Sequence, residues 1–64
     1  MTPAEIRALR RSRGETQAAF GAAVGRVLRR PAYARETVCR WESGARGSDV
    51  PWHLVAPVLT GRAA

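Results

Sequence analysis

The chain has 64 residues, with eleven basic residues, all arginine, against five acidic ones, and a formal net charge of +6 at pH 7. Its length supports one domain, 1–64, with a small core, since a chain this short buries only about 60% of its unfolded surface. A single cysteine, Cys39, and a single histidine, His53, exclude an internal disulfide and a four-ligand structural zinc site. The charge indicates a polyanionic partner, with a merely solubilising basic surface as the alternative.

The first predicted helix covers residues 3–13. Thr2 is a capping hydroxyl, Pro3 suits the first helical position, and Glu5 follows three residues after the cap. Ile6 and Leu9 form its buried stripe. Gly14 is placed to end it.

The second predicted helix begins at about Gln17, after the cap Thr16. Its end has two interpretations. Gly25 could be a terminal left-handed residue. Alternatively, one amphipathic helix continues to Pro31, because apolar residues recur at i, i+4, i+7 and i+8, namely Phe20, Val24, Val27 and Leu28. We favour the longer helix.

A connector at 31–33 should follow, because Pro31 disfavours helical geometry at the residue before it. The third predicted helix, 35–43, buries Val38 and Trp41 and ends at Gly44. Together with residues of the first two helices, these form the predicted core: Ile6, Leu9, Phe20, Val24, Val38 and Trp41.

A final helix is predicted with Ser48 or Asp49 as its cap and Pro51 in its first turn. Its inward residues would be Trp52, Val55 and Leu59, with Trp52 either in the core or in a subunit interface. Pro57 should kink this helix or break it into two short turns.

Two motifs, in this order, resemble a known family. Thr16-Gln17-Ala18-Ala19-Phe20-Gly21 opens the second helix, and Thr37-Val38-Cys39-Arg40-Trp41-Glu42-Ser43-Gly44 closes the third. Over residues 3–60 the chain resembles the Cro/C1-type helix-turn-helix of phage repressors and bacterial xenobiotic-response-element regulators. The resemblance implies an all-α, lambda-repressor-like fold of four to five helices. The departure is the stretch 26–33, which lengthens the connection between helices 2 and 3.

The resemblance implies that the third helix enters the major groove of double-stranded DNA. The residues that would contact the bases are then Arg35, Glu36, Cys39 and Arg40. Arginine suits guanine O6 and N7, and glutamate can accept from the cytosine amino group, so we expect a G/C-containing half-site. The alternatives are a solvated face with intrahelical charge pairs for Arg35, Glu36 and Arg40, and semi-buried packing for Cys39.

Gln17, in the first turn of the second helix, is expected to contact a phosphate of the DNA backbone. Further phosphate candidates are Thr37, Arg13, Arg29, Arg30 and Arg46. The segment 29–33 could be a spacer or an added DNA-contacting projection. The resemblance also implies an internal pair between Arg10 and Glu42. The alternative for Glu42 is a solvated residue, slightly unfavourable near a helix C-terminus.

The expected function is therefore that of a homodimeric, sequence-specific regulator that represses transcription by occluding promoter DNA at a pseudo-palindrome. We expect no catalysis, cofactor, metal, small-molecule ligand or membrane association, and a cytoplasmic protein associated with the nucleoid through its operator. One alternative is an antitoxin or anti-CRISPR-associated autoregulator of a phage or mobile-element operon. Another is a protein-interaction module whose basic face binds an acidic partner, and RNA binding is a third.

Overall fold

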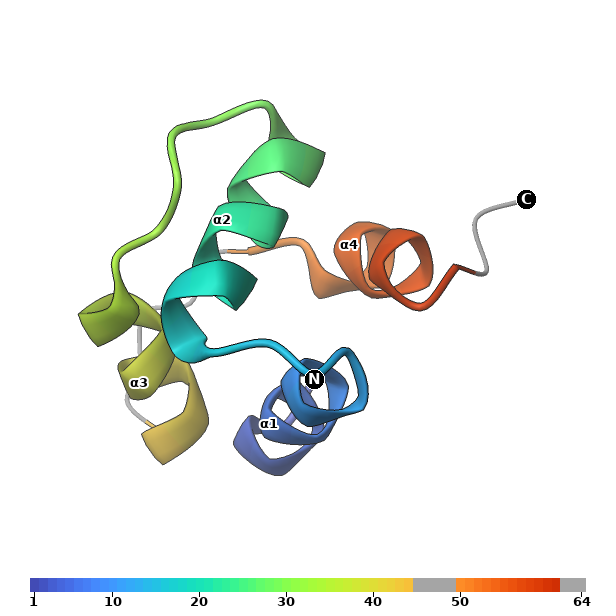
Figure 1. The fold of residues 1–64 in the computed structure, drawn as a ribbon. Coiled ribbons are helices and arrows are strands. Elements are labelled where there is room, and N and C mark those ends of the chain that lie inside the picture. Colours follow the sequence, from blue (N-terminus) through green and yellow to red (C-terminus); the bar gives the residue numbers. More distant parts are fainter. Residues whose placement is uncertain (45–49, 62–64) are drawn as a thin grey trace.

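Four helices account for most of residues 1–44 and 50–61, the part of the chain that the computed structural model describes. They are α1 (Pro3–Ser12), α2 (Gln17–Leu28), α3 (Arg35–Ser43) and α4 (Trp52–Leu59). In Figure 1, α2 lies between α3 and α4, and α1 packs below them beside α3. The predicted all-α class is confirmed, with no strand in the described residues. None of these helices has the length and hydropathy needed to cross a bilayer.

The start of α1 is built by reciprocal capping, as the sequence predicts. The hydroxyl of Thr2 accepts from the backbone N–H of Glu5 at 3.1 Å, and the Glu5 carboxylate accepts from the Thr2 N–H at 2.7 Å. These bonds satisfy two donors that a helix start would otherwise leave unpaired. The helix ends at Ser12, one residue before the predicted end, and Gly14 follows in the left-handed region with φ 67°.

Helix α2 begins at Gln17, as predicted, and its cap Thr16 accepts from the backbone N–H of Ala19 at 3.1 Å. It continues through Gly25, so the interpretation of Gly25 as a terminal left-handed residue is wrong. The predicted continuation to Pro31 is also too long, because the helix ends at Leu28 and Arg29 takes the left-handed conformation, with φ 56° and ψ 45°.

The connector after α2 turns back and runs along the helix it has just left (Figure 1). The backbone N–H of Tyr33 donates to the carbonyl of Gly21 at 3.2 Å. A Cβ atom on Gly25 would lie 2.8 Å from the carbonyl oxygen of Pro31, and one on Gly21 would overlap the Tyr33 carbonyl oxygen. The two glycines therefore make room for the returning backbone, and α3 begins beside the middle of α2.

Helix α3 matches its predicted range, 35–43, and ends at Gly44, which has φ 87°. Helix α4 differs from the prediction at its start and at Pro57. Pro51 precedes the helix as its N-cap residue instead of lying in the first turn, and the predicted caps Ser48 and Asp49 lie outside the described residues. Helix α4 is continuous from Trp52 to Leu59 with Pro57 inside it, so the predicted break into two short turns is wrong. Pro57 removes one backbone donor, while Val55 and Leu59 on either side of it are packed in the core.

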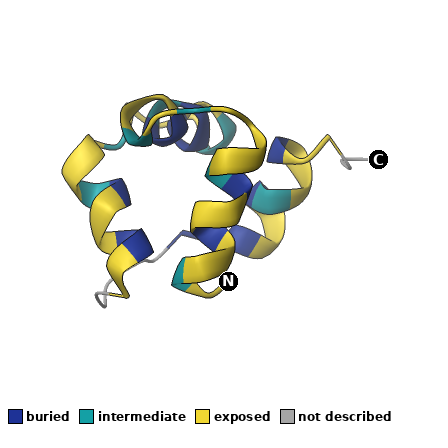
Figure 2. Ribbon diagram, turned by 60° about the horizontal axis from the view of Figure 1, so that its bottom comes forward, coloured by how far each residue is buried: buried dark blue, intermediate teal, exposed yellow. Residues whose placement is uncertain are grey.

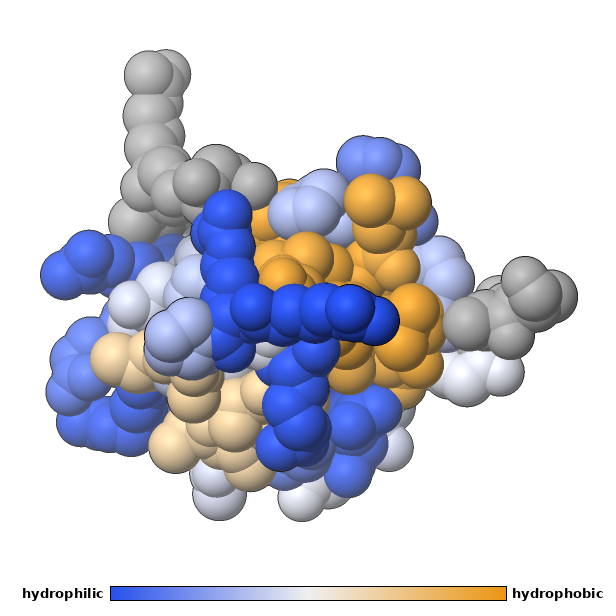
Figure 3. All heavy atoms as spheres, turned by 90° about the horizontal axis from the view of Figure 1, so that it is seen from above, coloured by the Kyte–Doolittle hydropathy of each residue, from blue (hydrophilic) through white to orange (hydrophobic). Residues whose placement is uncertain are grey.

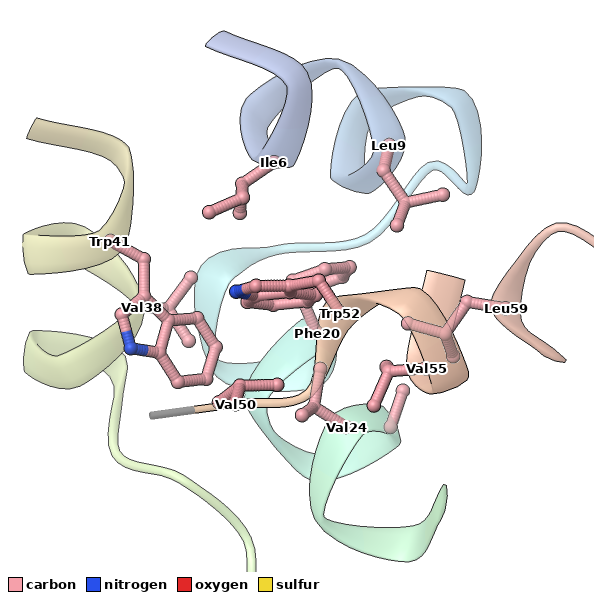
Figure 4. Packing of buried hydrophobic residues seen from close by; sticks show 11 residues of the cluster. Ile6, Leu9, Phe20, Val24, Val38, Trp41, Val50, Trp52, Val55 and Leu59 are labelled. Atoms are coloured by element: carbon pink, nitrogen blue, oxygen red, sulfur yellow. The ribbon is translucent and has the colours of Figure 1, made fainter. Parts of the chain in front are cut away.

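The core collects side chains from all four helices (Figure 4). Phe20 of α2 stacks on Trp52 of α4 with ring centroids 6.2 Å apart, and Trp52 meets Trp41 of α3 edge-on at 5.2 Å. Trp52 is thus a core residue in this chain, which decides between its two predicted places. Every predicted core position is buried, and Ala23 and Val50 are buried in addition. The buried hydrophobic residues are Ile6, Leu9, Phe20, Ala23, Val24, Val38, Trp41, Val50, Trp52, Val55 and Leu59.

Candidate nucleic-acid interface

A buried ion pair joins α1 to α3. The Glu42 side chain is only 4% exposed, and Arg10 approaches it with two donors: Nε lies 2.6 Å from Oε2 and Nη2 lies 3.1 Å from Oε1. This is the fork geometry in which a guanidinium binds a carboxylate most strongly. The structure thus brings together the two residues that the sequence paired, and it excludes the solvated alternative for Glu42.

The same carboxylate has partners that the sequence analysis missed. The side-chain amide of Gln17, at the start of α2, donates to Glu42 Oε1 at 3.4 Å. Arg7 donates to the Glu42 backbone carbonyl at 3.1 Å, and its Nε lies 3.7 Å from Oε1. The one available signal was the spacing of Arg7 and Arg10, which places both on one face of a helix. Glu42 therefore ties three helices together near one end of the molecule.

The charge on Glu42 is stabilised despite its burial. Desolvation raises the pKa of the Glu42 carboxyl, but hydrogen bonds from Arg10 and Gln17 and the positive charges of Arg10 and Arg7 outweigh it. The net pKa of Glu42 is below the ordinary glutamate value. At neutral pH the carboxylate is therefore ionised and can hold α3 against α1.

The outward face of α3 carries all four residues predicted to read bases. At about 100° per residue, positions 35, 36, 39 and 40 occupy one side of a helix. Each of these residues is exposed, whereas Val38 and Trp41 point into the core (Figure 4). Figure 2 shows the same division for the whole fold, with exposed and buried residues following one another along the helices. Arg35 and Glu36 approach to 3.7 Å but remain 65% and 68% exposed, so their mutual attraction is weak. Cys39 is exposed, contrary to the semi-buried alternative.

The residues predicted to contact phosphates differ in their exposure and in their bonds within the molecule. The guanidinium of Arg13 is held by the Glu15 carboxylate at 2.7 and 3.2 Å and by the backbone carbonyl of Leu59 at 2.6 Å. Arg13 thus closes the end of α1 onto α4. Thr37 is half-buried on α3. Arg46 lies outside the described residues.

Arg29 and Arg30 lie at the far end of α2 from Gln17. Both are exposed, and the Nη1 of Arg30 reaches the Tyr33 hydroxyl at 3.5 Å. Tyr33 itself packs edge-on against Trp41, with ring centroids 5.0 Å apart. The segment 29–33 is therefore anchored through Tyr33, while its arginines are exposed.

The described residues contain no group of three His, Cys, Asp or Glu side chains placed to hold a metal ion. Comparisons of the chain with protein-family models, curated proteins and solved structures find no match. The features of this chain that bear on function are therefore the exposed face of α3 and the ion pair that supports it.

Proposed function

We propose that this chain is a sequence-specific regulator that binds double-stranded DNA through the outward face of α3. The observation that supports this most directly is the set Arg35, Glu36, Cys39 and Arg40, exposed together on a helix that Glu42 holds in place. A recognition helix needs both properties, because side chains that read bases must be presented from a rigid support.

The dimensions and chemistry of α3 suit the major groove. Nine residues give a helix roughly 13 Å long, against a groove about 12 Å wide. Arg35 and Arg40 offer paired donors for guanine, and Glu36 offers an acceptor for the cytosine amino group. We therefore expect a G/C-containing half-site.

Gln17 supports the proposal from a second helix. It lies in the first turn of α2, where free backbone N–H groups favour a phosphate oxygen, and its amide also donates to Glu42. A phosphate bound there would fix the register of α3 in the groove. We keep Gln17 and Thr37 as proposed backbone contacts and leave out Arg13, because Glu15 neutralises its charge and all three of its nitrogens already donate within the molecule.

The arrangement of α2 and α3 is proposed to be a lambda-repressor-like helix-turn-helix in which the connector is lengthened. One such helix reads too few bases for a genome, so a homodimer on a pseudo-palindrome with half-sites about 34 Å apart is part of the proposal. The proposal includes no effector site, so the regulator would repress transcription simply by occupying promoter DNA.

The test compares single substitutions on a duplex selected by the wild-type protein. Arg40→Ala should lose about 1–3 kcal/mol of binding free energy and relax the preference at one base position. Arg11→Ala is the matched control, because Arg11 is an exposed residue of α1 and its loss removes the same charge without changing α3. Equal, sequence-independent losses for both variants would contradict base reading by α3.

A further inference from the structure

A second surface, formed by α4 and the end of α2, combines exposed aliphatic side chains with arginines. Leu54 and Val58, one turn apart on α4, are 59% and 47% exposed. Figure 3 looks down on this surface and shows long hydrophilic side chains lying against a hydrophobic area that spans the end of α2 and the neighbouring α4. We call it the α2–α4 surface, defined by Arg26, Val27, Leu28, Arg29, Arg30, Leu54 and Val58.

Its arginines have no carboxylate to neutralise them within the described residues. The Glu side chains described there bond elsewhere: Glu5 to the start of α1, Glu15 to Arg13, Glu36 to Arg35 and Glu42 to Arg10. Helix α4 carries neither an acidic nor an arginine residue. The α2–α4 surface is therefore positively charged and partly apolar, and its charge is uncompensated by the described chain.

Arg29 adds a second observation. A non-glycine residue in the left-handed region costs about 1–2 kcal/mol, and glycine or asparagine is the usual choice there. The left-handed residue ends α2, as is common at helix C-termini, but the choice of arginine there costs stability that glycine would not. Its exposed side chain adds a positive charge at the end of α2.

From these observations we propose that the α2–α4 surface docks an acidic amphipathic protein segment. Carboxylates of the segment would face Arg26, Arg29 and Arg30, and its aliphatic side chains would cover Leu54 and Val58. A short helix with leucines on one side and glutamates beside them has this complementarity. This role is separate from DNA binding by α3 and goes beyond it.

Other occupants fit less well. A second copy that used this same surface would offer arginines and no carboxylate, so it lacks the charge complementarity that an acidic segment has. A DNA backbone supplies phosphates but nothing apolar to cover Leu54 and Val58. An anionic bilayer normally requires a longer apolar face with aromatic anchors, and here Trp41 and Trp52 are buried.

The first experiment titrates the ¹⁵N-labelled protein with a synthetic helix-forming peptide of about 15 residues, patterned with leucine at i, i+3 and i+4 spacing and glutamate between. A scrambled peptide of the same composition is the control. The proposal expects binding at least about tenfold tighter for the patterned peptide, with shifts confined to α4 and the end of α2. Equal affinity for both peptides, or shifts centred on α3, would overturn it.

Two variants separate the apolar and charged contributions. The double substitution Leu54→Ser with Val58→Ser should abolish the preference for the patterned peptide. Arg29→Gln with Arg30→Gln should weaken binding of the patterned peptide about fivefold and make that binding less dependent on salt concentration. Arg11→Gln is the control and should change the affinity for the patterned peptide less than twofold. Because all these side chains are exposed, far-ultraviolet circular dichroism should show that each variant remains helical.

Two further measurements keep this proposal independent of the DNA proposal. The Leu54→Ser, Val58→Ser variant should bind a selected duplex as the wild type does, and that duplex should not displace the peptide. Displacement would show that the peptide occupies the DNA site, which overturns docking at the α2–α4 surface. Equal or tighter Leu54-dependent binding to anionic phosphatidylserine vesicles would overturn it in favour of a membrane.

Discussion

The backbone N–H of Tyr33 donates to the carbonyl of Gly21 at 3.2 Å, so the connector between α2 and α3 lies directly on the helix that precedes it. The contact lies two residues before α3 begins. It also explains how a helix that extends past Gly25 can still be followed by a helix packed beside its middle. The connector leaves at Arg29, returns past Gly25 and Gly21, and starts α3 at Arg35.

This packing predicts that replacing the glycines of α2 by alanine lowers the unfolding free energy, which is the opposite of the usual effect. Gly→Ala inside a helix normally stabilises by about 1 kcal/mol. Gly21→Ala and Gly25→Ala should instead destabilise by about 1–3 kcal/mol, because the new methyl group would meet the backbone of Tyr33 or Pro31. Urea unfolding measures the unfolding free energy of both variants. Ala18→Gly, at an exposed position of the same helix, is the control and should lose about 1 kcal/mol through propensity alone. Stabilised alanine variants would show that the connector does not lie on α2.

The Arg10–Glu42 pair predicts strong coupling between α1 and α3. Glu42→Leu alone should cost about 3 kcal/mol, because it leaves Arg10 without its carboxylate. That is most of the stability available to a chain of this length. Adding Arg10→Met should recover much of the loss, since a hydrophobic pair can replace a buried ion pair. Unfolding free energies of the two single variants and the double variant give the coupling directly. Additive losses would mean that the pair contributes nothing as a pair.

The lowered pKa of Glu42 predicts how stability depends on pH. A carboxyl whose pKa is lower in the folded state contributes stability above its unfolded pKa, about 4.3, and loses it as pH falls through the folded pKa. Stability should therefore be level between neutral pH and about pH 5 and decrease below about pH 4. In a variant that retains a fold without this carboxyl, Arg10→Met with Glu42→Leu, the acid-side decrease should be smaller. An unchanged acid-side slope would contradict the assignment.

The left-handed conformation of Arg29 predicts a stabilising substitution. Arg29→Gly should raise the unfolding free energy by up to about 1 kcal/mol, because glycine adopts this conformation without the Cβ penalty. Arg29→Asn, which also tolerates it, should fall between the two. Thermal unfolding followed by circular dichroism compares the three proteins. A destabilised glycine variant would mean that the Arg29 side chain contributes more to folding than its exposure indicates.

The parts of the fold that depend on local chemistry could be predicted from the sequence. The Thr2 and Thr16 caps placed two helix starts, and apolar spacing identified the buried residues of α1, α2 and α3. The end of α2 was predicted less well. Its pattern of apolar residues continues past Leu28, and nothing local to Arg29 indicates a left-handed residue.

The support of the candidate site could be predicted only in part. The Arg10–Glu42 pair came from a resemblance, whereas Gln17 and Arg7 join it through contacts between helices far apart in the sequence. The bonds of Arg13 to Glu15 and Leu59 likewise depend on how α1 meets α4. The role of Gly21 and Gly25 was hidden for the same reason, because it arises from a backbone segment that returns to them.

The central claim is that α3 reads DNA sequence. The most direct measurement selects bound duplexes from a random library at about 150 mM salt, then titrates the best duplex and a scrambled version of it, since at low salt any protein this basic binds DNA without specificity. If α3 reads sequence, the selected duplex should be a pseudo-palindrome with G/C-containing half-sites, bound at least about 10³-fold more tightly than the scrambled duplex. Equal and steeply salt-dependent binding to both duplexes would contradict it.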